Sequence, residues 1–167
     1  MATIRLTEAR LSATGAVPFR LDPGMAIEGM LVGTTVRTLE GSFPVEYLSV
    51  GDRVVTRGGA SRLTGIEITV VRNARVVRIA ADTPGLETPQ DTVTVAAAQT
   101  VLLHGWRAKA VSGTDQALVA AGRLCDGRYI TAETLGEARL FKLTFTEAAV
   151  IYAGGLLLAC ERTKICA

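Results

Sequence analysis

Residues 33–56 read GTTVRTLEGSFPVEYLSVGDRVVT, and this stretch decides the fold that we expect. Gly41 permits a reversal of the chain between two short extended runs. Val45 is expected to anchor the connecting segment in the core. Gly51 and the aspartate after it make a turn into a strand that carries Val54 in a sheet. The stretch therefore predicts a hairpin, an inserted connection and a further strand.

Alternation of apolar and polar residues continues along the rest of the chain. Because successive side chains of a strand point to opposite faces, this pattern is typical of half-buried strands. Frequent turns separate the runs, and many short strands with turns indicate an all-β fold. One helix is expected at residues 115–124, where Leu118, Ala121 and Leu124 fall roughly on one face, and it should end near Asp126. The alternating runs are residues 3–7, 66–70, 77–79, 92–95 and 141–145.

The length of 167 residues predicts a single domain with a sizeable core. Hydrophobic residues make up 49% of the chain, aromatic residues only 5%, and the mean hydropathy is +0.32. That is apolar for a small domain, so part of the surface is expected to be covered by a protein partner or another copy of the chain. An Ala- and Val-rich composition without any partner is the alternative.

The net charge of +2 indicates no strong preference for acidic partners. Arginine nevertheless supplies 15 of the 18 basic residues, and six arginines lie close together in the sequence. They would form either a weak nucleic-acid-binding face or, as we expect, solvated strand edges. Asp52 and Glu67 dilute their charge, and no aromatic residue stands between them to stack on bases. The six are Arg53, Arg57, Arg62, Arg72, Arg75 and Arg78.

The cysteines predict free thiols in a reducing compartment. Cys125, Cys160 and Cys166 are an odd number and lack the close-spaced pairs that hold zinc. His104 is the only further soft ligand, so neither a metal site nor a cofactor is expected. Cys125 is expected to be a small buried side chain. Trp106, which follows the turn after His104, is expected to be half-buried.

No membrane or export segment is expected. Residues 1–20 show no long apolar run, so no signal peptide is evident. The most apolar stretch, residues 148–160, is too short for a bilayer, which needs about 20 residues. A cytoplasmic protein is therefore predicted, although export by another route or incorporation in a larger particle would also agree with the sequence.

Two stretches together resemble the Hedgehog/intein (Hint) family, in its bacterial form. The first is residues 33–56, with the Pro-Val-Glu-x-Leu and Gly-Asp-x-Val elements that such domains place after the turn holding their nucleophile. The second is residues 94–103, TVAAAQTVLL, which is similar to the Hint strand that normally reads Val-Ser-Pro-x-His-Arg-Val-Leu. The resemblance covers residues 27–161. It implies a compact Hint fold, with residues 1–26 as an N-terminal extension and 162–167 as a tail.

The resemblance also implies where self-cleavage chemistry would lie. In such domains a Cys or Ser attacks the preceding carbonyl, and a histidine protonates the leaving amine. Here the nucleophile position falls at Gly29 and the imidazole position at Gln99, and Ala96 replaces a hydroxyl residue three before it. A second imidazole position aligns loosely with residues 146–148. Asn73, the only asparagine, lies in mid-chain, so no terminal asparagine is present for cyclisation.

These observations predict a non-catalytic Hint-like domain with no catalytic, cofactor-binding or metal-binding residues. We expect it to be no enzyme and to act as a structural or protein-interaction module, possibly as a subunit of a larger bacterial assembly. No small-molecule substrate is evident from the sequence. Self-processing with an unusual nucleophile is one alternative, and weak nucleic-acid binding through the stretch from Arg53 to Arg78 is the other.

Overall fold

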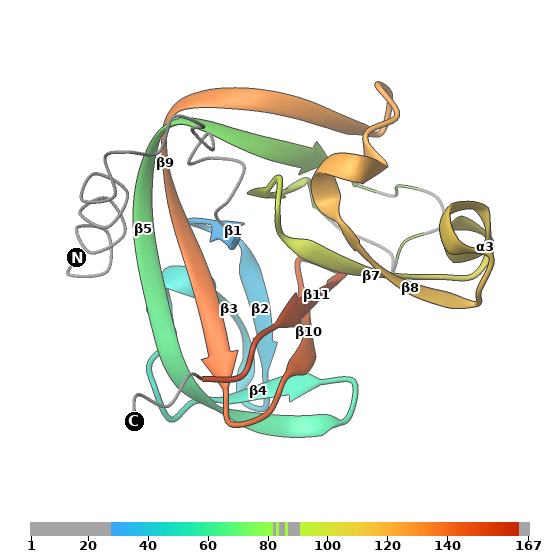
Figure 1. The fold of residues 1–167 in the computed structure, drawn as a ribbon. Coiled ribbons are helices and arrows are strands. Elements are labelled where there is room, and N and C mark those ends of the chain that lie inside the picture. The colour runs from blue at the N-terminus through green and yellow to red at the C-terminus, as the bar shows by residue number, and fades with distance from the viewer. Residues whose placement is uncertain (1–27, 82, 84–85, 87–90, 164–167) are drawn as a thin grey trace, which may run out of the picture.

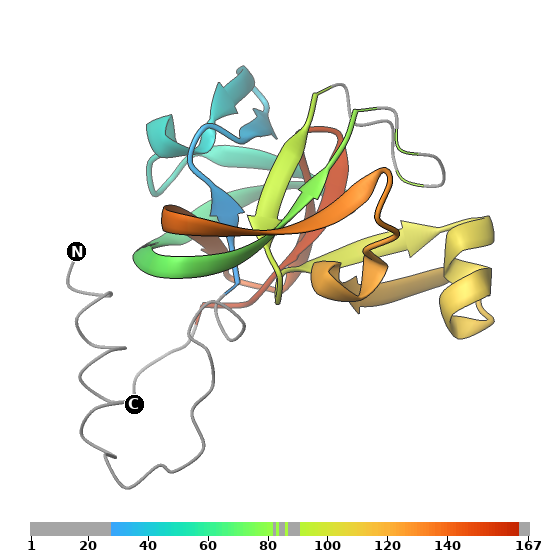
Figure 2. The same cartoon turned by 90° about the horizontal axis from the view of Figure 1, so that it is seen from above.

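The chain folds almost entirely into strands, as the computed structural model shows for residues 28–81, 83, 86 and 91–163 (Figures 1 and 2). The all-β fold with one short α-helix is thereby confirmed. The helical segments are η1 (Val45–Tyr47), α3 (Trp106–Ser112) and η2 (Ala121–Leu124). The strands are β1 (Met30–Leu31), β2 (Thr35–Thr38), β3 (Gly41–Pro44), β4 (Arg53–Thr56), β5 (Gly59–Ile79), β6 (Val93–Ala96), β7 (Thr100–His104), β8 (Gln116–Ala120), β9 (Ile130–Phe145), β10 (Ala149–Ala153) and β11 (Leu156–Cys160).

Two long strands, β5 and β9, form the frame of the molecule. They pair antiparallel from Leu63 opposite Phe145 to Ile79 opposite Ile130. Figure 1 shows them curving together up one side of the molecule and across its top. Near the middle of β5, Asn73 has a φ of 52°, a left-handed conformation that asparagine tolerates better than most residues. Pairing with β9 continues on both sides of Asn73, so this residue does not interrupt the frame.

Shorter strands close the sheet around the core. β6 pairs with both β5 and β1, and β1 pairs with β9, so these four strands form a closed ring. From the other end of β5 the sheet continues through β4, β2, β10, β11, β7 and β8, with β3 added beside β2. Since β5 takes part in both halves, one sheet folds over on itself and buries its inner face.

Residues 100–120 form an arm that extends from the body of the molecule (Figures 1 and 2). In this 100–120 arm, β7 and β8 pair antiparallel from Thr100 opposite Ala120 to His104 opposite Gln116. The helix α3 connects the two strands and ends at Gly113, whose φ of 79° suits glycine. The arm is thus a strand–helix–strand unit that joins the body through β7 and β11.

The stretch of residues 33–56 folds as its sequence predicts. β2 and β3 form a hairpin closed at Gly41, which has a φ of 127°. Val45 is fully buried in the short connection η1, and Val54 is fully buried in β4. Asp52 closes its turn by accepting a 2.8 Å hydrogen bond from the backbone N–H of Ser49. These contacts explain why this part of the sequence specifies its own local structure.

The core is made of aliphatic side chains from both halves of the sheet. Burial of this apolar surface is the main favourable term in folding. Among the largest fully buried side chains are Met30, Leu63, Ile79, Leu140, Phe145, Ile151 and Leu158. No helix among the described residues is long and apolar enough to cross a membrane.

The predicted helix at residues 115–124 is wrong in position. The α-helix lies earlier, at Trp106–Ser112, while the first half of the expected helix is the strand β8. Leu118 is 60% exposed there, and Val119 is buried instead. Only the end of the segment is helical, as the 3-10 turn η2, because pairing of β8 with β7 satisfies backbone groups that a helix would have bonded internally.

Two further expectations about single side chains are also wrong. Cys125 is exposed rather than buried, because the chain leaves the sheet directly after η2. Trp106 is 60% exposed rather than half-buried, since it begins α3 at the far end of the arm. The expected strand at residues 3–7 and Cys166 lie outside the described residues, so both stay predictions.

Candidate functional site

The positions that the sequence analysis singled out meet at one corner of the core. We call this the Gly29 corner and define it by the residues that surround Gly29 and Gln99. Gly29 is buried, and its backbone N–H donates a 2.9 Å hydrogen bond to the side-chain oxygen of Gln99. The carbonyl oxygen of Gly29 in turn accepts a 2.9 Å bond from the N–H of Ala96. The corner consists of Glu28, Gly29, Gln99, Lys142, Ala159, Cys160 and Glu161.

Gly29 has a backbone conformation that only glycine adopts easily. Its φ is 133°, and an added Cβ atom would lie 2.9 Å from the carbonyl oxygen of Phe141. Real Cβ atoms do not come that close to a backbone oxygen, so any side chain here requires the backbone to move. By resemblance to the Hint family, this position would carry the nucleophile. In this chain the surrounding backbone leaves no room for a side chain there.

Gln99 uses its whole side-chain amide in hydrogen bonds. Besides accepting from Gly29, its Nε2 donates to the carbonyl oxygens of Ala159 at 2.9 Å and Thr100 at 3.0 Å. The side chain is only 4% exposed, so these bonds replace water that the group has lost. Gln99 thereby connects the segment before β1 with the last strand, β11.

A chain of charged side chains covers the outer side of the corner. Lys142 of β9 lies 3.4 Å from a carboxylate oxygen of Glu28 and 3.0 Å from one of Glu161. Burial raises the pKa of Glu28, which the charge of Lys142 opposes and that of Glu161 assists. Burial would lower the pKa of Lys142, but its hydrogen bond to Glu161 and the charge of Glu28 outweigh this and raise it. The ammonium is therefore held protonated between two carboxylates.

Cys160 supplies the one thiol of the corner. It is buried at the end of β11, directly after the carbonyl of Ala159 that Gln99 bonds. Burial, followed by the negative charge of Glu28, raises the pKa of the Cys160 thiol to about 12. The thiol is thus almost entirely protonated at neutral pH and a weak nucleophile in this state.

The corner is too tightly packed to admit a separate substrate. Its hollow has a volume of about 10 Å³, at the lower limit for a single water molecule. Chemistry at this corner would therefore act on bonds of the chain itself. The peptide bond between Ala159 and Cys160 is the one whose carbonyl is already hydrogen-bonded by Gln99.

The structure brings together some of the residues named from the sequence and separates others. Gly29, Ala96 and Gln99 are neighbours, whereas His104 lies at the end of β7, opposite Gln116 in the arm. Residues 146–148 are exposed in the β9–β10 turn, so they do not occupy a place beside Gln99. Ala159 of β11 occupies it instead.

Sequence reasoning missed the parts of the corner that come from the end of the chain. Lys142 and Cys160 carry no motif around them, and only strand pairing places them beside Glu28 and Gln99. Within the residues that the structure describes, no three His, Cys, Asp or Glu side chains gather to hold a metal ion. The expectations of no metal and no cofactor stay predictions.

The six arginines from Arg53 to Arg78 are exposed along β4, β5 and the turn between them. Arg53 faces Arg62 across the β4–β5 pair, and Arg78 is compensated by Glu133 at 3.4 Å. β5 is paired with β9 and also with β4 and β6, so the expectation of solvated strand edges stays a prediction. Nucleic-acid binding through them stays an untested prediction.

Several solved structures have a fold similar to that of this chain, and the three described next are each 13% identical to it in sequence. The TvoVMA intein gives a TM-score of 0.55 at 13% identity, covering 79% of this chain and 96% of its own. A bacterial intein-like domain from Clostridium thermocellum gives 0.54 at 13%, covering 81% and 100%. A splice-inactive variant of the AceL NrdHF class 3 split intein gives 0.54 at 13%, covering 83% and 100%. No curated protein matches the chain by sequence.

These comparisons correct one expectation. From its sequence the chain is not expected to be an enzyme, because Gly29 and Gln99 replace a nucleophile and an imidazole. The solved structures that share its fold include inteins and an intein-like domain, and the AceL structure is described as a splice-inactive variant. These structural neighbours are at odds with the expectation of no enzyme, which is therefore contradicted.

The family itself is established by sequence. A family model described as the Hint domain matches residues 29–162, which is most of the chain and includes every strand from β1 to β11. The match begins at Gly29 and therefore includes most of the corner described above. Together with the fold, it shows that this chain belongs to the Hint domain family.

Proposed function

We propose that this Hint domain is a protein-interaction module that binds its partner through the 100–120 arm. The observation that carries the proposal is the apolar surface of that arm. Trp106 and Leu118 are each 60% exposed and Val111 is 48% exposed. The helix α3, which carries two of these residues, packs on β8, which carries the third. Tryptophan is enriched at protein interfaces, where it often dominates the binding energy.

Exposure of these side chains to water is costly unless a partner covers them. Each fully buried large apolar side chain contributes about 1.5–3 kcal/mol relative to its exposed state. The cation of Arg107 lies 5.1 Å from the ring centre of Trp106 and leaves most of the indole accessible. The arm also extends away from the body, so a partner would reach it without meeting the rest of the domain (Figures 1 and 2).

A binding experiment with matched variants tests this proposal. The tagged full chain would be incubated with untagged chain and with an extract of its source cells. We expect the double variant Trp106→Ser, Leu118→Ser to retain no partner protein. The control Val50→Ser changes a side chain that is 62% exposed outside the arm, and it should still retain the partner. Retention of the same proteins by all three chains, or of none by the wild type, would contradict the proposal.

We propose that the domain works in the cytoplasm of a bacterial cell. Support comes from Cys125 and Cys160, which are free thiols, as is usual in a reducing compartment. Fractionation of source cells would place the protein with soluble cytoplasmic markers if this is correct, and with exported or envelope markers if it is wrong.

The Gly29 corner favours self-processing as a second candidate function. In the reaction that we propose, the Cys160 thiol first gives its proton to solvent, and the thiolate adds to the carbonyl carbon of Ala159. The peptide C–N bond then breaks, and the released amine of Cys160 takes a proton from water. The product is a thioester, which water hydrolyses to a carboxylate and a thiol. Gln99 supports this step because its Nε2 already donates to the oxygen on which negative charge would develop.

The high pKa of the thiol makes this candidate directly testable. Because only the thiolate attacks, the rate would rise about tenfold per pH unit until the pKa of about 12 is approached. Intact-mass measurement at pH 7.5 and pH 10 would show the fragments 1–159 and 160–167, and Cys160→Ala would abolish them. A full-length mass that is unchanged after days at pH 10 would eliminate this reaction.

A further inference from the structure

The strand β8 is an open edge of the sheet, at the outside of the 100–120 arm (Figures 1 and 2). Within the described residues it pairs only with β7. Its sequence, QALVA, holds neither a charged residue nor a proline, and these are the residues that commonly protect edge strands from pairing with another chain. The edge strand β3, by contrast, ends in Pro44. β8 is therefore open to a further strand.

The hydrogen bonds of the arm show which backbone groups of β8 face outward. In an antiparallel pair, residues that exchange hydrogen bonds with the neighbouring strand alternate with residues that do not. The N–H of Gly105 donates to the carbonyl of Asp115 at 3.1 Å, and the N–H of Ala121 donates to the carbonyl of Gln99 at 2.8 Å. Both bonds assign the odd-numbered residues of β8 to the pairing with β7. The backbone N–H and C=O groups that point away from β7 are those of Gln116, Leu118 and Ala120.

Leu118 lies at the centre of this outward-facing set. In the part of the chain that the structure describes, its N–H and C=O have no hydrogen-bond partner, and its side chain is 60% exposed. A second β8 that runs antiparallel about a two-fold axis would place Leu118 opposite Leu118. Each N–H would then donate to the carbonyl oxygen of the other copy, and the two side chains would cover each other on one face. The edge is thus complementary to itself.

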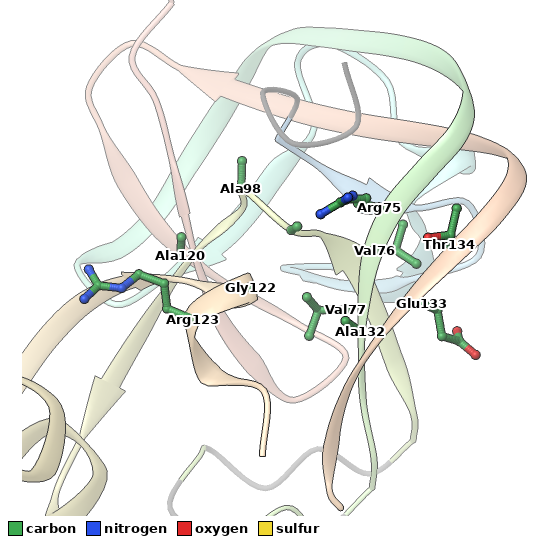
Figure 3. Close-up of a pocket in the computed structure, with 11 residues that line it drawn as sticks. Arg75, Val76, Val77, Ala98, Ala120, Gly122, Arg123, Ala132, Glu133 and Thr134 are labelled. Carbon is green, nitrogen blue, oxygen red and sulfur yellow. The ribbon is translucent and has the colours of Figure 1, made fainter. Parts of the chain in front are cut away.

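An open hollow at the base of the arm leaves room for a neighbouring side chain of such a pair (Figure 3). Its volume is about 530 Å³, and Ala120 lines it together with Ala98 and Gly122. Side chains two residues apart in a strand point to the same face, so Ala120 and Leu118 share one face of β8. In the two-fold arrangement Gln116 of the second copy lies opposite Ala120, and its side chain would extend into the hollow.

We propose that two copies of this chain associate by antiparallel pairing of their β8 strands, with Leu118 opposite Leu118. The pairing satisfies the outward-facing backbone groups of Leu118 and removes an exposed leucine side chain of each copy from water. The flanking pairs of Gln116 with Ala120 bring no like charges together. This inference rests on the function proposed for the 100–120 arm, because it names a second copy of the chain as the partner of that surface.

Sedimentation of the full chain, with variants at Leu118, tests the proposal. One short strand and a few side chains make a small interface, so we expect a dimer with a dissociation constant of about 10–100 µM. Leu118→Lys and Leu118→Glu each bring like charges opposite one another, so each should dimerise about tenfold more weakly or worse. An equimolar mixture of the two variants pairs opposite charges and should form the dimer again. Val50→Lys, at a side chain 62% exposed outside the arm, should dimerise as the wild type does.

Amide hydrogen exchange distinguishes strand pairing from contact of side chains alone. The amide of Leu118 should exchange rapidly in dilute protein and become protected as the dimer forms. The amide of Val119, which bonds to β7, should be protected at both concentrations. A dimer in which the exchange of Leu118 does not slow would refute the pairing of β8 strands.

The outcomes separate this inference from the proposed function of the arm. A wild-type chain that stays monomeric at about 500 µM, yet retains a different protein through Trp106 and Leu118, would overturn the inference and leave the function of the arm intact. A dimer that Leu118→Lys does not weaken, or a mixture of Leu118→Lys with Leu118→Glu that does not associate, would also overturn it. A chain that neither associates with itself nor retains any protein through the arm would overturn both.

Discussion

The backbone N–H of Gly29 donates a 2.9 Å hydrogen bond to the side-chain oxygen of Gln99, which lies 70 residues later in the chain. The same amide group reaches the carbonyl of Ala159 in the last strand. One neutral side chain therefore connects the segment before β1 with β11. The fold of the Hint family is preserved around this connection.

Replacement of Gln99 by leucine should destabilise the domain by about 2–4 kcal/mol. The change leaves the N–H of Gly29 and the carbonyl of Ala159 buried without a partner, and each such loss costs about 1–3 kcal/mol. Urea unfolding followed by circular dichroism measures the effect. Gln116→Leu, at an exposed position in β8, is the control and should change stability by less than about 0.5 kcal/mol. Equal stability of the two variants would show that the connection is energetically unimportant.

Substitution of Gly29 by alanine should cost more than the same change at Gly127. Both residues have positive φ, of 133° and 76°, so both variants carry backbone strain of about 1–3 kcal/mol. Only at Gly29 does the new Cβ also meet a backbone oxygen, that of Phe141 at 2.9 Å, whereas nothing lies within 4 Å at Gly127. Thermal unfolding of the two variants isolates the steric part. A Gly29→Ala variant no less stable than Gly127→Ala would be inconsistent with this close approach.

Stability should fall steeply in alkali because of Cys160. Burial raises the pKa of its thiol from 9.0 to about 12, so the folded state resists ionisation that the unfolded chain allows. The contribution of this pKa difference to the free energy of unfolding is fully present below pH 9 and is lost progressively between pH 9 and pH 12. At pH 10.5 the free energy of unfolding has fallen by about 2 kcal/mol. Urea midpoints at pH 8 and 10.5 would show a smaller decrease for Cys160→Ala than for wild type. Cys125→Ala, at an exposed thiol, should follow the wild type, and identical pH slopes in all three proteins would contradict the assignment.

The carboxylate of Asp126 should stabilise the turn before β9 only at pH values above its pKa. Its Oδ1 accepts hydrogen bonds from the backbone N–H groups of Arg128 and Tyr129 at 2.8 Å and Ile130 at 3.0 Å. These bonds, that of Ile130 foremost, lower the pKa of the Asp126 carboxyl. The contribution is therefore present above about pH 4 and lost as the pH falls through the lower folded value.

Comparison of Asp126→Ala with wild type tests this contribution. We expect a loss of about 1–2 kcal/mol at pH 6 that disappears towards pH 2. Asp115→Ala, which removes a carboxylate that is 84% exposed, serves as the control and should be close to neutral. A difference between Asp126→Ala and wild type that does not change with pH would mean that the charge of Asp126 plays no part.

Local sequence predicted those parts of the fold whose causes are local. The hairpin at Gly41, the buried Val45 and the turn closed by Asp52 all depend on residues within a few positions of one another. The failed prediction was the helix at residues 115–124. There the spacing of Leu118, Ala121 and Leu124 favoured a helix, but pairing with β7 across the arm made the first part a strand.

The candidate site was predicted only in part. The resemblance placed Gly29 and Gln99 together, and the structure joins them by a hydrogen bond. It gave no indication of Lys142 and Cys160, whose neighbours at the corner come from other strands. The resemblance also led to the prediction of no enzyme, which the likeness to inteins contradicts.

The sequence by itself determined that this chain is mostly β, because strand periodicity and glycine turns are properties of neighbouring residues. It also indicated the Hint family, because residues 33–56 and 94–103 resemble that family's motifs. Only the tertiary structure decided which residues surround Gln99 at the Gly29 corner. The contact of Gln99 with Ala159 spans 60 residues, and that of Lys142 with Glu28 spans 114. Contacts over such separations depend on the register of paired strands, which no short segment of the chain specifies.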